Sequence, residues 1–102
     1  MIRVTVSYPA VEGQRFDHSY YQTKHSALIG ELLEPHGLQR LEIDECLSNG
    51  AGKPPPVVAA AHMVFADQAT FQAGMAAAGK ALGADMKNYT DTPPTVVISE
   101  MR

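Results

Sequence analysis

The segment Val57–Ala66 constrains the fold more than any other part of the sequence, because His62 is its single polar residue. A short run of almost purely apolar residues predicts a β-strand that is buried on both faces and lies in the centre of a sheet. The uninterrupted apolar stretch inside it, residues 57–61, is far too short to span a bilayer. The rest of the chain is expected to supply neighbouring strands and a cover for each face.

Three other segments predict further strands. Residues 2–8 alternate apolar and polar side chains and end at Pro9, and residues 40–44 alternate in the same way. Residues 95–101 predict the last strand, which follows a turn over residues 87–94.

The stretch 16–37 predicts one long helix. Asp17 is a suitable N-cap, because its carboxylate can accept hydrogen bonds from the unpaired N–H groups of the first turn. Pro35 cannot lie in a helix interior, and Gly37 can adopt the left-handed conformation that ends a helix. We therefore expect the helix to cover residues 17–34.

A second helix is predicted after Asp67, which is another N-cap candidate. Apolar residues recur at helical spacing from Phe71 to Met86. Glycine is a poor helix former, so Gly79 or Gly83 is expected to interrupt this helix.

The predicted order of elements is β–α–β–β–α–β, over a single domain that covers residues 1–102. This order predicts an α+β ferredoxin-like fold, in which two helices cover one face of an antiparallel sheet. The apolar content of residues 57–65, together with Val96 and Val97, argues against leaving the other face open to water. A second copy of the chain is the simplest cover, so we expect a homodimer.

Composition excludes several classes of partner and compartment. The net charge is −3 and the Lys and Arg residues are scattered singly, which argues against nucleic acid or a membrane as partner. Cys46 is the one cysteine, so no internal disulfide can form and a reducing compartment fits. The first residues have neither the long apolar core nor the cleavage site of a signal peptide. We expect a cytoplasmic protein.

His25 interrupts the buried stripe of the first helix, formed by Tyr21, Leu28 and Leu32. A titratable ring at such a position needs a partner or costs stability. It is either a core-edge histidine held by one hydrogen bond or a functional residue, and the pattern leaves both open. Tyr21 lies one turn earlier on the same face, and a His–Tyr pair suits general acid–base chemistry.

The surroundings of His25 are expected to form a pocket. His62 projects from the strand predicted beneath the helices, although its face depends on the strand register. Residues 73–79 are rich in Ala and Gly, which leaves room for a ligand or allows close helix–sheet packing. Asn88 and Tyr89 lie in the predicted turn before the last strand, near the expected mouth of the pocket. Turn chemistry explains the asparagine but not the aromatic ring.

Other kinds of chemistry lack a signal in the sequence. Cys46 ends a strand with no activating group beside it, so a role as a small apolar residue is favoured. The histidines show no paired ligand spacing of a metal site. The GAGK string at 50–53 is followed by prolines instead of a helix, and no GxGxxG fingerprint occurs. Neither a metal nor a cofactor is expected.

Three strings occur in order along nearly the whole chain: FDHSYYQTKHSALIGELLEPHGL, VVAAAHMVFADQATFQAGM and NYTDTPPTVVISE. Together they resemble the EthD family of small dimeric α+β barrel proteins. The resemblance implies a ferredoxin-like fold that dimerises through its sheets, with a pocket between helices and sheet. By position in the strings it implies His25, Tyr21 and His62 as catalytic residues, and Asn88 and Tyr89 as substrate-binding residues.

The resemblance leaves two functions open. Members of the family are often labelled reductases, through an association with ether-degrading cytochrome P450 clusters, and superfamily relatives move protons on aromatic or carbonyl substrates. The first function is a small oxidoreductase or cofactor-free acid–base enzyme that acts on a small hydrophobic molecule, with His25 as acid or base. The second is a non-catalytic accessory protein that binds a hydrophobic metabolite or a partner in a catabolic pathway.

Overall fold

The computed structural model describes every residue from Met1 to Arg102. Its strands are β1 (Ile2–Pro9), β2 (Arg40–Glu45), β3 (Val57–Phe65) and β4 (Thr95–Glu100). The first helical run consists of α1 (His18–Tyr20), a π turn η1 (Tyr21–His25), α2 (Ser26–Leu33) and a 3₁₀ turn η2 (Glu34–His36). The second consists of α3 (Gln68–Asp85) and a 3₁₀ turn η3 (Met86–Asn88).

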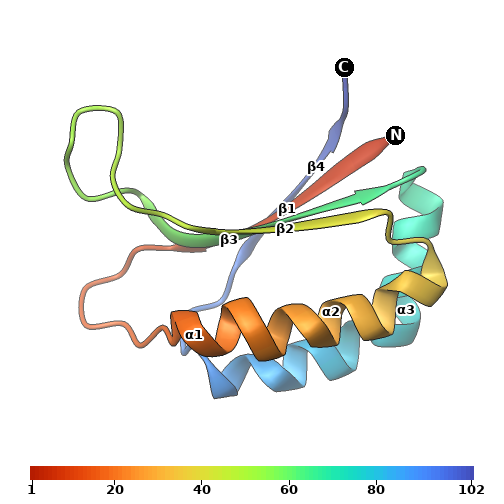
Figure 1. Cartoon of the computed structure of the whole chain (residues 1–102), viewed down its shortest axis with the longest axis horizontal. Coiled ribbons are helices and arrows are strands. Elements are labelled where there is room, and N and C mark those ends of the chain that lie inside the picture. Colours follow the sequence, from red (N-terminus) through yellow and green to blue (C-terminus); the bar gives the residue numbers. More distant parts are fainter.

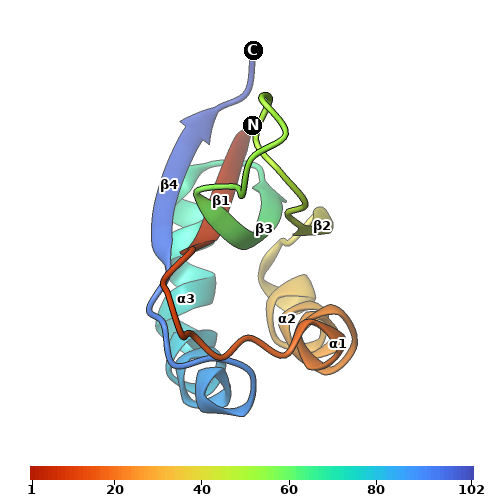
Figure 2. The same ribbon diagram turned by 90° about the vertical axis from the view of Figure 1, so that its left-hand side faces the viewer.

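The four strands form one antiparallel sheet in the order β2-β3-β1-β4. Both helical runs lie side by side on the same face of this sheet (Figure 1). Seen from the end, α3 lies beneath β4 and β1, while α2 lies beneath β2 (Figure 2). This is the ferredoxin-like α+β fold that the order of elements predicts, and β3 takes the predicted central position.

The strand register decides which side chains face the helices. Val4 is opposite Met63 on β3 and Ile98 on β4, and it is fully buried between the sheet and the helices. The next residue, Thr5, is opposite His62 and therefore points to the other face, because side chains alternate along a strand. His62 thus lies on the face of the sheet that no helix covers.

The hydrophobic core lies between the sheet and the helices. Phe65 of β3 packs edge-on against Phe71 of α3, with 5.4 Å between the ring centroids. Burial of each large apolar side chain contributes about 1.5–3 kcal/mol. The buried residues of this core come from four elements, β1, α2, β3 and α3: Ile2, Val4, Ile29, Leu33, Met63, Phe65, Phe71 and Ala78.

The first helical run begins and ends as the sequence predicts. The Asp17 carboxylate accepts a hydrogen bond of 3.0 Å from the Tyr20 backbone N–H. Gly37 ends the run with φ of 96°, a conformation that favours glycine. The predicted stripe is shifted: the buried residues recur at every fourth position, namely Tyr21, His25, Ile29 and Leu33.

The π turn explains this four-residue spacing. Four residues exceed one α-helical turn, so side chains spaced by four drift around a regular helix. A π turn contains more residues per turn and offsets part of that drift. Here the Ser26 backbone N–H donates to the Tyr21 carbonyl, five residues back. As a result, Tyr21 and His25 remain on the same face as Ile29 and Leu33.

The second helix differs from its prediction, because it continues through Gly79 and Gly83 to Asp85. Asp67 is the predicted N-cap, and its carboxylate accepts from the Thr70 backbone N–H at 2.8 Å. A third glycine, Gly74, faces the first helical run at close range. Gly74 lies against Leu33 and His36, and a Cβ added to it would be only 3.2 Å from His36.

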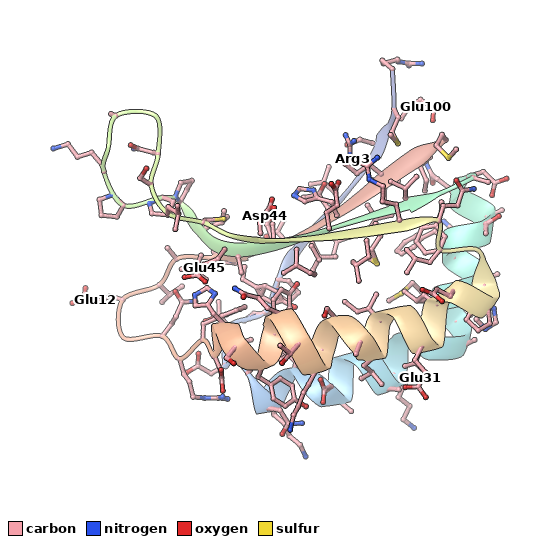
Figure 3. All side chains as sticks on the ribbon, in the orientation of Figure 1. Arg3, Glu12, Glu31, Asp44, Glu45 and Glu100 are labelled. Carbon is pink, nitrogen blue, oxygen red and sulfur yellow. The ribbon has the colours of Figure 1, made fainter.

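The uncovered face of the sheet is more polar than the sequence pattern suggests. It carries Arg3 from β1, Asp44 from β2 and His62 from β3, and the first two are labelled above the sheet in Figure 3. The apolar side chains on this face are the smaller ones, such as Val97, so the face is only partly apolar. No helix of the protein is both long enough and apolar enough to cross a membrane.

Candidate active site

A cavity of about 240 Å³ lies between the sheet and the two helical runs. It is mostly apolar, and its lining contains no Lys or Arg. The lining residues come from every layer of the molecule: Val6, Tyr8, Tyr21, His25, Ile29, Ala61, Met63, Met75, Gly79, Leu82, Gly83, Met86, Tyr89, Pro94 and Val96. A mostly apolar wall with a few polar groups is typical of a small-molecule site.

The polar groups of the cavity form one hydrogen-bonded cluster. The Tyr8 and Tyr89 hydroxyls are 2.7 Å apart, and the Tyr89 hydroxyl is 3.3 Å from His25 Nε2. The ring of Tyr21 stacks on that of His25, with 5.3 Å between the centroids. The four rings are all buried, with exposed fractions between 1% and 5%. The predicted residues Tyr21, His25 and Tyr89 therefore meet in one wall.

Asp85 holds His25 from the side opposite Tyr89. Its Oδ2 atom lies 2.8 Å from His25 Nδ1. Its Oδ1 atom accepts hydrogen bonds from the Tyr20 hydroxyl at 2.7 Å and from Asn88 Nδ2 at 2.9 Å. An ionised carboxylate can only accept, so His25 Nδ1 must carry a hydrogen in this contact. Asp85 therefore fixes the His25 ring and its tautomer.

The electrostatics of the cluster keep Asp85 charged and the tyrosines neutral. Burial alone would raise the pKa of Asp85, but the hydrogen bonds from His25, Tyr20 and Asn88 outweigh it and lower that pKa. Burial raises the pKa of Tyr21 and of Tyr89 well above the ordinary value. The hydroxyls of these two residues consequently keep their protons over the physiological pH range.

The π turn satisfies its own backbone while it places His25. In a regular α-helix the Gln22 carbonyl would accept from the Ser26 N–H, which here reaches Tyr21 instead. The Ser26 hydroxyl donates to that Gln22 carbonyl at 2.7 Å. Thr23 makes the same kind of bond to the Ser19 carbonyl, also at 2.7 Å. Hydroxyls near a helix irregularity often serve in this way.

Tyr89 is fixed in the wall by the backbone on either side of it. The Asp17 N–H donates to the Tyr89 carbonyl at 2.7 Å, which joins the start of the first helical run to the turn before β4. The Thr90 hydroxyl donates to the Arg15 carbonyl at 2.8 Å. Thus the turn carries an aromatic residue because that residue enters the cavity wall.

Two predicted residues lie outside the cavity lining. His62 is on the uncovered face, where Nε2 is 2.8 Å from Asp44 Oδ2 and Nδ1 is 3.3 Å from the Thr5 hydroxyl. The sheet separates it from His25, so the two histidines cannot share a site. The catalytic role of His62 stays a prediction, as does substrate binding by Asn88, which contacts Asp85 and Tyr20 instead of the cavity.

The cavity opens between β4 and α3. Its deep wall is buried, whereas Val96 on β4 is 51% exposed and faces the same space. On α3, a Cβ added at Gly83 would have no atom within 4 Å. The absence of a side chain at Gly83 therefore leaves this side of the cavity open. Gly79 and Gly83, the two glycines expected to break the helix, both line the cavity.

Two residues of the cluster escape sequence reasoning although each carries a signal. Asp85 is the last residue of α3, where the helix dipole disfavours a negative charge, so a carboxylate there requires a partner. Tyr8 ends the buried face of β1, and a buried tyrosine hydroxyl usually finds a hydrogen-bond partner. Both signals indicate a partner without identifying it.

The arrangement is suited to moving protons. A histidine oriented by a carboxylate, with a hydroxyl at its other nitrogen, is a common acid–base arrangement. Burial raises the pKa of the Cys46 thiol, which disfavours the nucleophilic thiolate. No group of three or more His, Cys, Asp or Glu side chains is placed to hold a metal ion.

Known proteins resemble this chain over nearly its whole length. The model of the EthD domain matches residues 12–93. An EthD-like protein from Ralstonia eutropha JMP134 is 35% identical, with a TM-score of 0.90 over 97% of this chain and 89% of that one. An EthD family protein from Bacillus halodurans C-125 is 20% identical, with a TM-score of 0.78 over 100% and 99% of the two chains.

A more distant structure shares the fold alone. A protein from Jannaschia sp. CCS1, described as dimeric and ferredoxin-like, is 20% identical, with a TM-score of 0.59 over 98% of this chain and 97% of that one. No curated protein matches this chain.

Proposed function

The chain belongs to the EthD domain family, and on this premise we propose that it is a cofactor-free acid–base enzyme for a small hydrophobic molecule that carries an oxygen. The observation that carries the proposal is the buried contact of 2.8 Å between His25 Nδ1 and Asp85 at the wall of an apolar cavity. A carboxylate in this position fixes the tautomer and makes Nε2, beside the Tyr89 hydroxyl, the atom that accepts a proton.

The residues divide naturally into two roles. His25 acts as general base and later as general acid: Nε2 takes a proton from the bound molecule and returns it to another atom. The Tyr21 hydroxyl is a donor for an oxygen on which negative charge develops, as in an oxyanion site. For an enolisable carbonyl compound, the electrons of the broken C–H bond pass to the carbonyl oxygen. No net oxidation or reduction occurs.

A second candidate is supported by the closed pairing of the polar groups. Tyr8, Tyr89, His25 and Asp85 already bond to one another, and the remainder of the lining is apolar. Such a cavity also suits a protein that binds a hydrophobic metabolite without changing it. Both candidate functions require that the cavity binds a small hydrophobic molecule, and only the enzyme would also convert it.

Proton exchange at carbon tests the enzyme proposal without knowledge of the natural substrate. We expect the protein to accelerate the exchange of the α-protons of 1-indanone and 2-tetralone into D₂O, followed by NMR. His25→Gln should lower the rate by about 10²–10⁴, the range for a positioned acid–base residue. The control is His36→Gln, which alters an exposed histidine at a helix end. Binding of both ketones with no exchange would favour the binding protein.

We also propose a homodimer formed by the uncovered sheet faces. The Jannaschia protein of the same fold is described as dimeric. On this face Arg3 lies near Glu42 and Asp44, which line one depression with it. A two-fold axis through the face could therefore pair the arginine of one subunit with acidic residues of the other.

A further inference from the structure

When His25 is neutral, only one direction of donation satisfies every hydrogen-bond contact of the cluster. Asp85 can only accept, so His25 Nδ1 donates to it and Nε2 is left as an acceptor. In that direction the one hydroxyl hydrogen of Tyr89 is donated to Nε2. At the 2.7 Å contact with Tyr8, Tyr89 must then accept and Tyr8 must donate.

Tyr8 is the last member of this series of hydrogen bonds and lines the cavity, and in this direction it has no hydrogen to donate to a ligand. The Tyr8 hydrogen is used on Tyr89, so its oxygen offers only lone pairs to the cavity. An oxygen has two lone pairs, and one remains available even where the neighbouring Tyr21 hydroxyl donates to it. The group that a ligand meets at Tyr8 is therefore an acceptor.

We propose that the cavity selects a neutral one- or two-ring compound with a hydroxyl group, a phenol or an enol, whose O–H donates to the Tyr8 oxygen. The proposal rests on the function proposed above and concerns the hydroxyl-bearing form of the ligand, which for a carbonyl compound is its enol.

The size and charge of the cavity agree with this class of ligand. An apolar cavity of about 150 Å³ can hold benzene, so the 240 Å³ present here accommodates one ring with substituents or two fused rings. No cationic side chain lines the space, which disfavours a carboxylate or a phosphate. Burial raises the pKa of Tyr8, so its hydroxyl keeps its proton when no ligand is bound.

The same chain gives a path for the ligand's proton. As the ligand O–H proton passes to the Tyr8 oxygen, the Tyr8 proton moves to Tyr89 and the Tyr89 proton moves to His25 Nε2. The ligand becomes a phenolate or enolate, and His25 becomes an imidazolium beside the Asp85 carboxylate. One proton is transferred in total, and both tyrosines end as neutral as they began.

Three naphthalene compounds distinguish a donor from an acceptor: 2-naphthol donates, 2-methoxynaphthalene only accepts, and naphthalene does neither. The chain has no tryptophan, so the fluorescence of these probes reports binding to the intact protein with little background. We expect 2-naphthol to bind about tenfold more tightly than the other two, the effect of one well-placed hydrogen bond.

Variants test whether Asp85 sets this preference. Asp85→Asn can donate an amide hydrogen to His25 Nδ1, which reverses the chain and should reduce the preference for 2-naphthol to about one. If Asp85→Asn does not fold, Tyr89→Phe breaks the same chain and should have the same effect. Tyr20→Phe is the matched control, because it removes a different hydrogen bond to Asp85 and should keep the preference.

The outcomes separate this inference from the proposed function. Equal binding of the three probes by the unaltered protein would overturn the inference and leave acid–base chemistry intact. The inference would also be overturned if the unaltered protein bound 2-methoxynaphthalene more tightly than 2-naphthol. It would be overturned likewise if both Asp85→Asn and Tyr89→Phe kept the preference for 2-naphthol. Failure of all three probes to bind would overturn the cavity as a ligand site, and the proposed function with it.

Discussion

The Asp85 carboxylate accepts hydrogen bonds from three side chains, His25, Tyr20 and Asn88, at distances of 2.7–2.9 Å. These bonds offset both its burial and its unfavourable place at the end of α3. A lowered pKa means that the folded protein binds this proton less tightly than the unfolded chain does. The bonds therefore stabilise the fold at pH values above the ordinary carboxylate pKa.

Asp85→Asn should lower the free energy of unfolding by about 1–3 kcal/mol at pH 7, since hydrogen bonds to a charged group are lost. As the pH falls below about 4, the contribution of the unaltered carboxylate disappears and the two proteins should converge. Urea denaturation at pH 7 and pH 3 measures both differences. Glu31→Gln, an exposed change on α2, should have no effect at either pH. The same deficit at both pH values for Asp85→Asn would contradict this account.

The four tyrosines should titrate abnormally. The pKa of each is raised, by burial for Tyr8, Tyr21 and Tyr89 and chiefly by the hydrogen bond to Asp85 for Tyr20. The folded chain therefore holds these protons more tightly than the unfolded chain, so stability is complete below about pH 10 and is lost above it.

Ultraviolet absorbance of tyrosinate measures this titration directly, because the chain has no tryptophan. We expect little ionisation until the pH exceeds about 10, followed by a steep rise that coincides with unfolding. The urea-denatured chain should titrate at about pH 10 and serves as the reference. A folded protein whose tyrosines titrate like those of the denatured chain would show that the cluster is solvated.

Sequence reasoning indicates those residues of the cavity lining whose signal is local. His25 and Tyr21 stand out as an odd ring and its neighbour on one helix, and Tyr89 as an aromatic residue that turn chemistry does not explain. Asp85 was missed because its partner His25 lies 60 positions away along the chain. His62 was grouped with His25 because only strand pairing decides its face, and a shift of one residue would reverse it.

The helix α3 uses glycine for two different purposes. At Gly74 an added Cβ would be 3.2 Å from His36 and 3.3 Å from Leu33, so the absence of a side chain allows the helices to approach. At Gly83 no atom lies within 4 Å of an added Cβ, and the missing side chain leaves the cavity entrance open.

The two glycines should respond oppositely to alanine. Gly83→Ala should raise the free energy of unfolding by about 0.5–1 kcal/mol, because alanine is the better helix former. Gly74→Ala should lower it by about 1 kcal/mol or more, since overpacking against Leu33 and His36 outweighs the gain in propensity. Thermal denaturation of the two variants measures the contrast. If both variants gain stability, the helices can separate at little cost and Gly74 is not needed for their approach.

The elements themselves were predictable because their signals are periodic and local. Alternating apolar and polar residues predict β1 and β2, and a continuous apolar run predicts β3. The N-cap residues predict where both helices begin. The π turn η1 could not be predicted, because it depends on burying Tyr21 and His25 together against the sheet. The continuation of α3 through Gly79 and Gly83 likewise reflects tertiary contacts that override propensity.

Two adjacent valines on β4 test the proposed dimer. Val97 is 52% exposed on the uncovered face, opposite Thr5, whereas Val96 is 51% exposed on the helix side. Val97→Glu would bury an unpaired charge in the proposed interface and should give a folded monomer. Val96→Glu introduces the same charge at the same exposure and should remain dimeric. Sedimentation at micromolar concentration decides, and a dimer in both variants would locate the interface elsewhere.

The cluster joins distant parts of the chain, because His25 and Asp85 are 60 positions apart and Tyr8 and Tyr89 are 81 positions apart. Closing loops of this length costs chain entropy before any contact forms, so such contacts tend to form late in folding. The site should then be absent from the folding transition state. Tyr89→Phe should speed unfolding by roughly five- to thirty-fold, for a loss of about 1–2 kcal/mol. Its folding rate in stopped-flow experiments should stay unchanged, whereas a slower folding rate would place the cluster in the nucleus.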